Sequence, residues 1–296
     1  MQKEYKENHL KPYAVRSIKC RGRIHKESEN DTRSPYQRDR DRIIHSSSFR
    51  RLKHKTQVFV NTDGDHYRTR LTHSMEVSQI ARTLARSLSL NEDLSETLSL
   101  SHDLGHTPFG HAGEEILNNC MSNHGGFDHN IQTLRIVILL ENKYYSFSGL
   151  NLTIETLDGL IKHNGPVKNF STFQRIFRNN LIQNKINFSS YPSLEAQAAA
   201  ISDDIAYNNH DLEDGLRAKL FSIKKLSNIT LVRNIINKHI KNIKVFRKEI
   251  IINQIIRELI NLMVMDVIKN TRKNIKKYNI KTTHDVYKVN HPLVDF

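Results

Sequence analysis

The sequence predicts an all-α protein. Apolar residues recur every three or four positions along much of its 296 residues, and no stretch alternates apolar and polar residues for long enough to form a substantial sheet. The hydrophobic fraction is 38%, and a chain of about 300 residues can bury roughly 75% of its unfolded surface. We therefore expect a large helical core at residues 36–216, preceded by a basic N-terminal arm at 1–35 and followed by a basic helical extension at 217–296.

The segments before residue 70 show no pattern that predicts a long helix. Residues 1–35 are basic and show little apolar periodicity, so we expect an exposed arm. Residues 36–60 place apolar side chains at spacings compatible with short helical turns, with many arginines between them. The sequence Asn-Thr-Asp-Gly at 61–64 predicts a turn.

Longer amphipathic helices are expected wherever the apolar positions keep a helical period. These stretches are 71–91, 94–104, 128–141, 152–163 and 193–216. We expect Gly105 and Pro108 to end the second helix and Asp128 to cap the third. The tail from 218 to 278 keeps the helical period and carries many Lys and Arg residues.

Several classes of protein are excluded by what the chain lacks. No apolar run approaches the roughly 20 residues of a membrane-spanning helix, and the start of the chain is polar without an apolar signal core. Its 2 cysteines are too few for a disulfide framework. We therefore expect a cytoplasmic protein with no membrane partner.

The net charge of +14 has two interpretations. A polyanionic partner, either nucleic acid or a phosphorylated small molecule, would favour such a surface. The same chain is also rich in Ile and Asn, and a general drift of composition toward Lys would give the charge no functional meaning. Both interpretations stay open at this point.

Four positions concentrate residues that can bind a metal ion: His73, His102, Asp103 and Asp203. Two imidazoles and two carboxylates suit a divalent cation and leave positions for water and a phosphate oxygen. Such a cation lowers the pKa of bound water to about 7 and neutralises phosphoryl charge. A single histidine on a helix is more often a packing residue, so the prediction depends on the whole set.

Five segments follow one another in order between residues 33 and 216. They are RSPYQRDRDRIIHSSSFRRLKHKTQVF, RTRLTHSMEVSQIAR, HDLGHTPFGHAGEE, GGFDHNIQTLRI and SLEAQAAAISDDIAYNNHDLEDGLR. Together they resemble the dGTP triphosphohydrolase (dGTPase-like) family of the HD-domain metal-dependent phosphohydrolase superfamily. The resemblance implies an HD-domain helical bundle with peripheral helices. It also implies hydrolysis of a deoxynucleoside triphosphate, dGTP or another dNTP, to the deoxynucleoside and tripolyphosphate.

The resemblance further implies roles for individual residues. The metal ligands would be His73, His102, Asp103 and Asp203, and the divalent cation could be Mn, Mg, Fe, Co or Zn. The catalytic histidine would be His106, helped by His129 and by Glu114, a carboxylate that orients a histidine. Arg70 would bind phosphate oxygens, Arg51 would lie near the nucleotide, and Gln57 would lie near the base and sugar. Tyr207 would stack on the deoxyribose, and Asp211 would accept a hydrogen bond from its 3′-hydroxyl.

Helical spacing distinguishes Asp203 from its neighbour Asp204 as the metal ligand. Residues four and eight apart share a helix face, whereas consecutive residues point about 100° apart. From Asp203 these steps reach Tyr207 and Asp211, which suit a deoxyribose. From Asp204 they reach an asparagine and a leucine. The sequence therefore favours Asp203.

Two other functions remain open. Another HD-type hydrolase, acting on nucleoside monophosphates or cyclic nucleotides, would keep the ligands but would not need Tyr207 and Asp211. A non-catalytic nucleic-acid-binding protein on the same scaffold would explain the positive charge. The family resemblance also allows a homo-oligomer, and family members usually continue with further helices beyond the residues that end this chain, so a truncated extension is one expectation.

Overall fold

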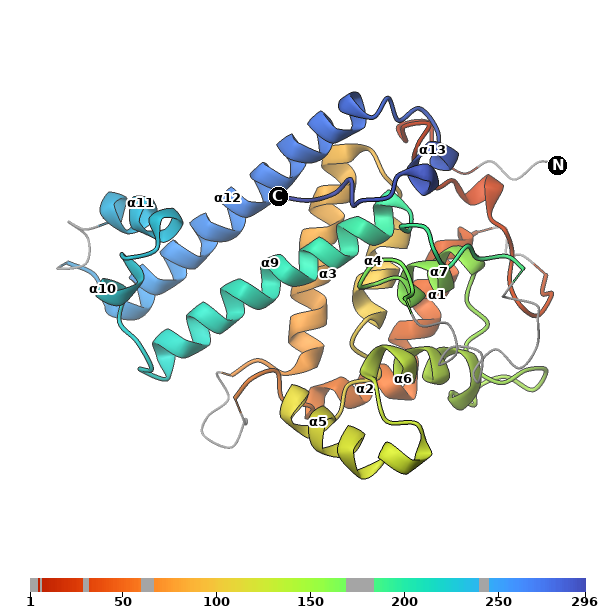
Figure 1. The fold of residues 1–296 in the computed structure, drawn as a ribbon, viewed down its shortest axis with the longest axis horizontal. Coiled ribbons are helices and arrows are strands. Elements are labelled where there is room, and N and C mark those ends of the chain that lie inside the picture. The colour runs from red at the N-terminus through yellow and green to blue at the C-terminus, as the bar shows by residue number, and fades with distance from the viewer. Residues whose placement is uncertain (1–4, 6, 29–31, 60–66, 169–183, 240–244) are drawn as a thin grey trace.

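The all-α prediction is confirmed. A computed structural model describes residues 5, 7–28, 32–59, 67–168, 184–239 and 245–296. In these ranges the regular structure is helical, and β pairing is limited to isolated bridges such as that between Arg23 and Thr153 (Figure 1). The turn predicted at 61–64 lies outside the described residues. Within the described ranges, no helix combines the length and apolar character needed to cross a bilayer.

The bundle begins with the short helices that the arginine-rich segment predicts. Helix α1 (Pro35–Ile44) starts with a capping box between Ser34 and Gln37, so two backbone donors that the helix leaves free are satisfied. Helix α2 (Ser47–Arg51) follows, capped by Ser46, and leads into the 3₁₀ turn η2 (Leu52–His54). These elements bury Tyr36, Ile43 and Leu52 in one apolar cluster.

Three predicted helices pack against one another in the centre of the molecule: α3 (Arg70–Leu88), α4 (Glu92–Ser101) and α9 (Leu194–Arg217) (Figure 1). Each starts at a side chain that accepts a hydrogen bond from the first turn, namely Thr69, Asn91 and Ser193. The predicted short helix α7 (Ile154–Ile161) packs beside α4 and α9. Apolar side chains of α3 and α9 share a second buried cluster.

The segment after α4 contains a helix that periodicity did not predict, α5 (Gly110–Cys120). Its N-cap Phe109 makes no capping bond through its side chain and has φ of 65°, and Gly110 has φ of 58°. Ala112, Ile116 and Leu117 keep a helical spacing in the sequence, but only Gly110 of this helix is buried, so its apolar side chains stay outside the core. The 3₁₀ turn η4 (Ser122–His124) follows it.

The next predicted helix forms in two parts. Helix α6 (His129–Arg135) is capped by Asp128 as predicted, because the Asp128 carboxylate accepts from the N–H of Ile131. The chain then continues as a short π-helical stretch, η5 (Ile136–Leu140), so the predicted helix at 128–141 changes its hydrogen-bond pattern midway.

The expectation of an exposed N-terminal arm is wrong for part of the described segment, although residues such as His9, Lys11 and Lys26 are exposed. Leu10, Ala14 and Val15 are buried in the two apolar clusters. The backbone N–H of Val15 donates to the buried carboxylate of Glu195 on α9 (2.9 Å). A few apolar residues without periodicity are enough to dock this segment, because α9 offers it a buried acceptor.

The helical tail is confirmed where it is described. It contains α10 (Ile223–Leu226), α11 (Thr230–His239), α12 (Lys248–Lys277) and α13 (Thr283–Lys288). The long α12 runs beside α9, and α10 and α11 pack at its far end (Figure 1). The last residues return to the bundle, where the N–H groups of Leu293 and Val294 donate to Gln197 of α9 (2.7 and 3.1 Å).

A buried ion pair joins the N-terminal segment to the bundle. The guanidinium of Arg23 donates to Asp39 of α1, and both side chains are almost fully buried. The other Asp39 oxygen accepts from the N–H and hydroxyl of Thr153 (2.8 and 2.7 Å) and from Thr156 (2.7 Å). One carboxylate thus links the N-terminal segment, α1 and the start of α7.

We expect Asp39→Ala to lower the free energy of unfolding by about 3–5 kcal/mol, because it breaks the buried ion pair with Arg23 and removes the acceptor of Thr153 and Thr156. The matched control on the same helix is Asp41→Ala. Its salt bridge to the exposed Arg33 (2.6 Å) is open to solvent and contributes at most about 1 kcal/mol. Urea unfolding of the two variants measures the difference, and equal losses would contradict this account.

Candidate functional site

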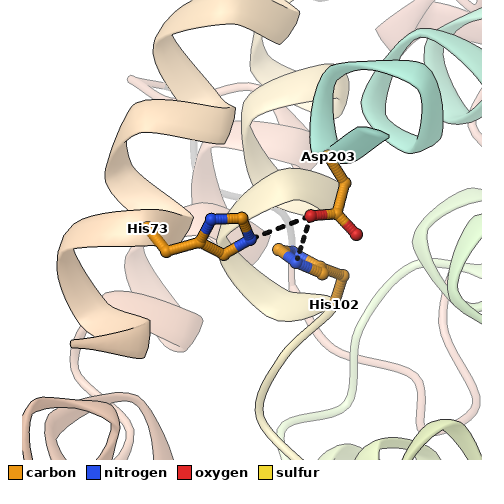
Figure 2. A group of neighbouring side chains, drawn as sticks. All are labelled: His73, His102 and Asp203. Carbon is orange, nitrogen blue, oxygen red and sulfur yellow. Dashed lines mark hydrogen bonds and ion pairs between the residues drawn. The ribbon is translucent and has the colours of Figure 1, made fainter. Parts of the chain in front are cut away.

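Three predicted metal-binding side chains meet between the central helices. His73 lies one turn into α3, His102 follows the last residue of α4, and Asp203 lies in the middle of α9. Figure 2 shows both imidazole rings turned toward the Asp203 carboxylate. Its Oδ1 lies 2.8 Å from His73 Nε2 and 3.5 Å from His102 Nε2. Both histidines are buried and Asp203 is half-buried.

The environment of His102 favours a cation at its Nε2. Its Nδ1 lies 2.6 Å from the carbonyl oxygen of Ser99, and because a carbonyl can only accept, Nδ1–H is the donor. The buried Nε2 has no hydrogen-bond partner among the described residues. Burial by itself would lower the pKa of His102, but attraction to Asp103 and Asp203 outweighs burial and raises it to about 9. The two carboxylates therefore draw positive charge to Nε2.

Asp103 lies at the margin of this group. Its Oδ2 accepts from Nη1 of the buried Arg70 (2.9 Å), and its Oδ1 lies 3.5 Å from His102 Nε2. Burial opposes ionisation of Asp103, but His102 and Arg70 outweigh burial and hold its pKa well below the usual range. Asp103 is thus an ionised carboxylate that offers one oxygen to the site and holds Arg70 with the other.

The geometry of the group fits a divalent cation. His73, His102 and Asp203 offer ligand atoms that all lie within 4.8 Å of one another. With metal–ligand bonds of about 2.1 Å, neighbouring ligand atoms lie roughly 3.0–3.4 Å apart, close to the spacings observed here. Two imidazoles with carboxylate oxygens form a donor set that transition metals accept.

Two histidines that the sequence analysis left without a role lie against these side chains. His163, which follows α7, stacks on His102 with ring centroids 5.2 Å apart, and its Nε2 lies 3.5 Å from Asp203 Oδ2. His210 of α9 places its Nδ1 3.1 Å from His73 Nδ1. His210 lies two helical turns after Asp203, so helical spacing contained a signal for it. No comparable signal marks His163.

A second group forms beside the first: His106, Glu114 and His129, with ligand atoms within 4.8 Å of one another. Glu114 of α5 accepts from the backbone N–H of His129 (2.8 Å) and lies 2.8 and 2.9 Å from its Nδ1. The rings of His106 and His129 stack with centroids 3.9 Å apart. His106 Nε2 also lies 3.3 Å from Asp103 Oδ1, which connects the two groups.

His106 and the exposed His111 differ in their surroundings. Burial lowers the pKa of His106 to about 2, and the nearby Arg70 and His129 add to this effect. His106 is therefore a neutral imidazole at physiological pH. His111 lies in the first turn of α5, with its Nδ1 3.2 Å from Glu114 Oε2. The unpredicted helix α5 thus carries both this histidine and the carboxylate that contacts His129.

The predicted substrate residues fall into two sets. Gln57, Arg70 and Asp211 each keep one buried polar atom without a hydrogen-bond partner among the described residues. Buried polar atoms are normally hydrogen-bonded, so these three favour contact with a ligand or water. Tyr207 is exposed on α9, one turn before Asp211. Arg51 is exposed at the end of α2, and its contacts add no support for a role.

Comparison with known proteins shows which proteins the chain is similar to. A model of the HD domain matches residues 70–208, the span that contains His73, His102, Asp103 and Asp203. The chain is 62% identical over 278 residues to a deoxyguanosinetriphosphate triphosphohydrolase-like protein of Pelagibacter ubique, covering 94% of this chain and 75% of that protein. Proteins of the same description from Parvibaculum lavamentivorans (52% identity; 96% and 73% covered) and Thiobacillus denitrificans (48%; 93% and 71%) are also similar.

Proposed function

The chain belongs to the deoxyguanosinetriphosphate triphosphohydrolase-like family of HD-domain proteins, and on this premise we propose that it hydrolyses a deoxynucleoside triphosphate to the deoxynucleoside and inorganic tripolyphosphate in a metal-dependent reaction. Membership of the family indicates a phosphohydrolase. The observation that carries the finer proposal is the convergence of His73 Nε2, His102 Nε2 and Asp203 Oδ1 at one point beside Arg70 and Asp103.

His73, His102, Asp103 and Asp203 would hold the divalent cation. A bound cation of this kind supplies Lewis acidity, which acidifies water and neutralises charge on a phosphoryl group. The protein adds a fixed positive charge of its own in Arg70. This guanidinium is buried and tied to Asp103 through Nη1, while its buried Nε has no partner among the described residues. We assign Arg70 to a phosphate oxygen, an anionic acceptor with which arginine forms strong, charge-assisted hydrogen bonds.

The deoxyribose would lie along α9. Tyr207 and Asp211 occupy the face that continues from Asp203, so a sugar held there stays next to the phosphates. The ring of Tyr207 offers an apolar surface, and the unpartnered Oδ1 of Asp211 offers an acceptor for the 3′-hydroxyl. The unpartnered Oε1 of Gln57 adds a polar contact for the base or sugar.

The proton that the departing 5′-oxygen needs would come from His129. Water adds to the α-phosphorus, the bond from phosphorus to the 5′-oxygen breaks, and that oxygen takes a proton. Glu114 accepts from Nδ1–H of His129. A second hydrogen, on Nε2 of the same ring, would go to the 5′-oxygen, and the proton that the attacking water loses would replace it. His106, stacked on His129 and in contact with Asp103, supports this ring beside the phosphates.

We expect turnover of at least one dNTP to release tripolyphosphate and deoxynucleoside in equal amounts when a divalent cation is present. Ion chromatography of the products, over a panel of dNTPs and metals, measures this. Asp203→Ala, purified in parallel, controls for contaminating phosphatases. Release of orthophosphate or pyrophosphate by the wild-type protein would reject this reaction, and turnover confined to monophosphates would favour another type of HD hydrolase.

The paired variants Asp203→Ala and Asp204→Ala test the ligand assignment. Asp204 is exposed, whereas Asp203 contacts both His73 and His102. We expect Asp203→Ala to lower metal affinity by more than the roughly 10–100-fold that loss of an outer contact costs, and to lose nearly all turnover. Asp204→Ala should keep its metal. Elemental analysis and metal titration would contradict the assignment if Asp203→Ala were fully loaded and Asp204→Ala empty.

His129→Gln should lower kcat by about 10²–10⁴-fold, the contribution typical of a general acid, while its metal content stays at the wild-type level. The control is His124→Gln, an exposed histidine at the end of η4, which should retain wild-type kcat. Steady-state kinetics with parallel metal analysis makes the comparison. An unchanged kcat in His129→Gln would remove this residue from the proton transfer.

A further inference from the structure

The first turn of α5 presents backbone N–H groups that the helix itself does not use. Its first internal hydrogen bond runs from the N–H of Gly113 to the carbonyl oxygen of Phe109 (3.3 Å), so the N–H groups of Gly110, His111 and Ala112 have no acceptor within the helix. The N-cap Phe109 makes no capping bond through its side chain. A helix start with free N–H groups carries partial positive charge and favours an anion.

The backbone at this helix start suits a bound anion. Gly110 has φ of 58°, and right-handed helical residues follow it. A left-handed residue next to a right-handed one directs consecutive N–H groups into one concavity, which is a recurrent anion-binding arrangement. Helix geometry alone does not identify a site, so the neighbouring side chains decide the case.

The guanidinium of Arg70 lies beside this helix start. A Cβ atom added to Gly110 would lie 3.4 Å from Arg70 Nη2. Arg70 is only 4% exposed, its Nη1 donates to Asp103, and its buried Nε has no hydrogen-bond partner among the described residues. Nε and Nη2 form one edge of the guanidinium, and such an edge can bind two oxygens of a phosphate group with parallel hydrogen bonds. The edge with the unpartnered Nε therefore includes the nitrogen nearest to Gly110.

The charges around Arg70 also favour an anion. The N–H of Arg70 donates to the carbonyl oxygen of Lys55 (3.0 Å), and the Lys55 ammonium group donates to the carbonyl oxygen of Leu104 (3.1 Å). Two positive side chains thus lie near the start of α5, and the Asp103 carboxylate offsets one of them. Glu114, further along α5, contacts His129 (2.8 Å). Asp103 also places this region next to the metal site, because its other oxygen lies 3.5 Å from His102 Nε2.

We propose that the start of α5 is a phosphate-binding subsite, in which the N–H groups of Gly110, His111 and Ala112 and the Nε–Nη2 edge of Arg70 bind the non-bridging oxygens of one phosphate group. The ligand class is a polyphosphate chain. This inference rests on the proposed function, which supplies the triphosphate. It gives α5 a role in substrate binding through its backbone, in addition to the side chains that it carries.

The test is Ala112→Glu, which puts a carboxylate at the third position of α5, where it competes for the same N–H groups. The matched control is Asn119→Glu, the same change of charge at an exposed position in the last turn of α5. We expect the affinity for inorganic tripolyphosphate, measured by calorimetric titration with Mg²⁺ present, to fall about 2–30-fold in Ala112→Glu, the range of helix-terminus effects on a nearby charge. Asn119→Glu should stay near the wild-type value. Equal affinities in the three proteins, or equal losses in the two variants, would overturn the subsite.

Thermal unfolding separates lost binding from a damaged fold. A carboxylate near the start of a helix stabilises the helix, so Ala112→Glu should unfold at the wild-type temperature or above it while it binds tripolyphosphate more weakly. Ala112→Gln has nearly the same shape without the charge, and its tripolyphosphate affinity should lie closer to the wild-type value. Equal losses in Ala112→Gln and Ala112→Glu would show that size alone causes the effect and would overturn the subsite.

Amide spectra of the wild-type protein test the contact without any variant. When tripolyphosphate is added, the ¹H–¹⁵N signals of Gly110, His111 and Ala112 should move to lower field, as expected for new hydrogen bonds to an anion. The internal control is the first turn of α4, a helix start that Asn91 caps, whose signals should stay in place. Unchanged signals at the start of α5 under saturating tripolyphosphate would overturn the subsite.

These experiments distinguish failure of the subsite from failure of the proposed function. If tripolyphosphate moves the α5 signals but the protein releases no tripolyphosphate from any dNTP, the proposed reaction is wrong and the subsite stands. If dNTP turnover releases tripolyphosphate while the α5 signals and the affinity of Ala112→Glu stay unchanged, the subsite is wrong and the proposed function stands.

Discussion

The mutual packing of α3, α4 and α9 is the constraint on which the candidate site depends. Each helix contributes one side chain to one point, and removing two imidazoles and a carboxylate from water costs free energy unless hydrogen bonds or a bound cation compensate for it. Apolar burial holds these helices together despite that cost. Val77 lies one turn after His73, and Ile205 lies close to Asp203 on α9; both are fully buried in the cluster that α3 and α9 share. A buried side chain of this size contributes roughly 1.5–3 kcal/mol.

Each side chain at this point is held from behind by a different group. Ser99 holds His102 through a backbone carbonyl, His210 holds His73, and Arg70 holds Asp103. Because the outer atoms are occupied, the inner atoms remain directed at one another in fixed orientations, which is how outer contacts tune a metal site. The packing of the three helices therefore determines the geometry of the site. His106 lies outside these helices, in the segment between α4 and α5.

The sequence predicted those features that depend on local spacing. The helices with a regular apolar stripe, the cap at Asp128, and the choice of Asp203 over Asp204 as the residue that faces His73 all follow from the helical period. Features that depend on tertiary contacts were missed. The N-terminal segment docks because α9 presents Glu195 to Val15. Helix α5 was missed although Ala112, Ile116 and Leu117 keep a helical spacing. Helical spacing contained a signal for His210, whereas the position of His163 against the site required the three-dimensional packing.

The residues of this site lie far apart in the sequence, so the site can form only late in synthesis of the chain. His73 and Asp203 are 130 residues apart, so α9 leaves the ribosome long after α3. At a synthesis rate of about 5–20 residues per second the delay is roughly 6–26 s. During that time the apolar face of α3 has no α9 to cover it, and exposed apolar surface of this kind makes a nascent chain prone to aggregation.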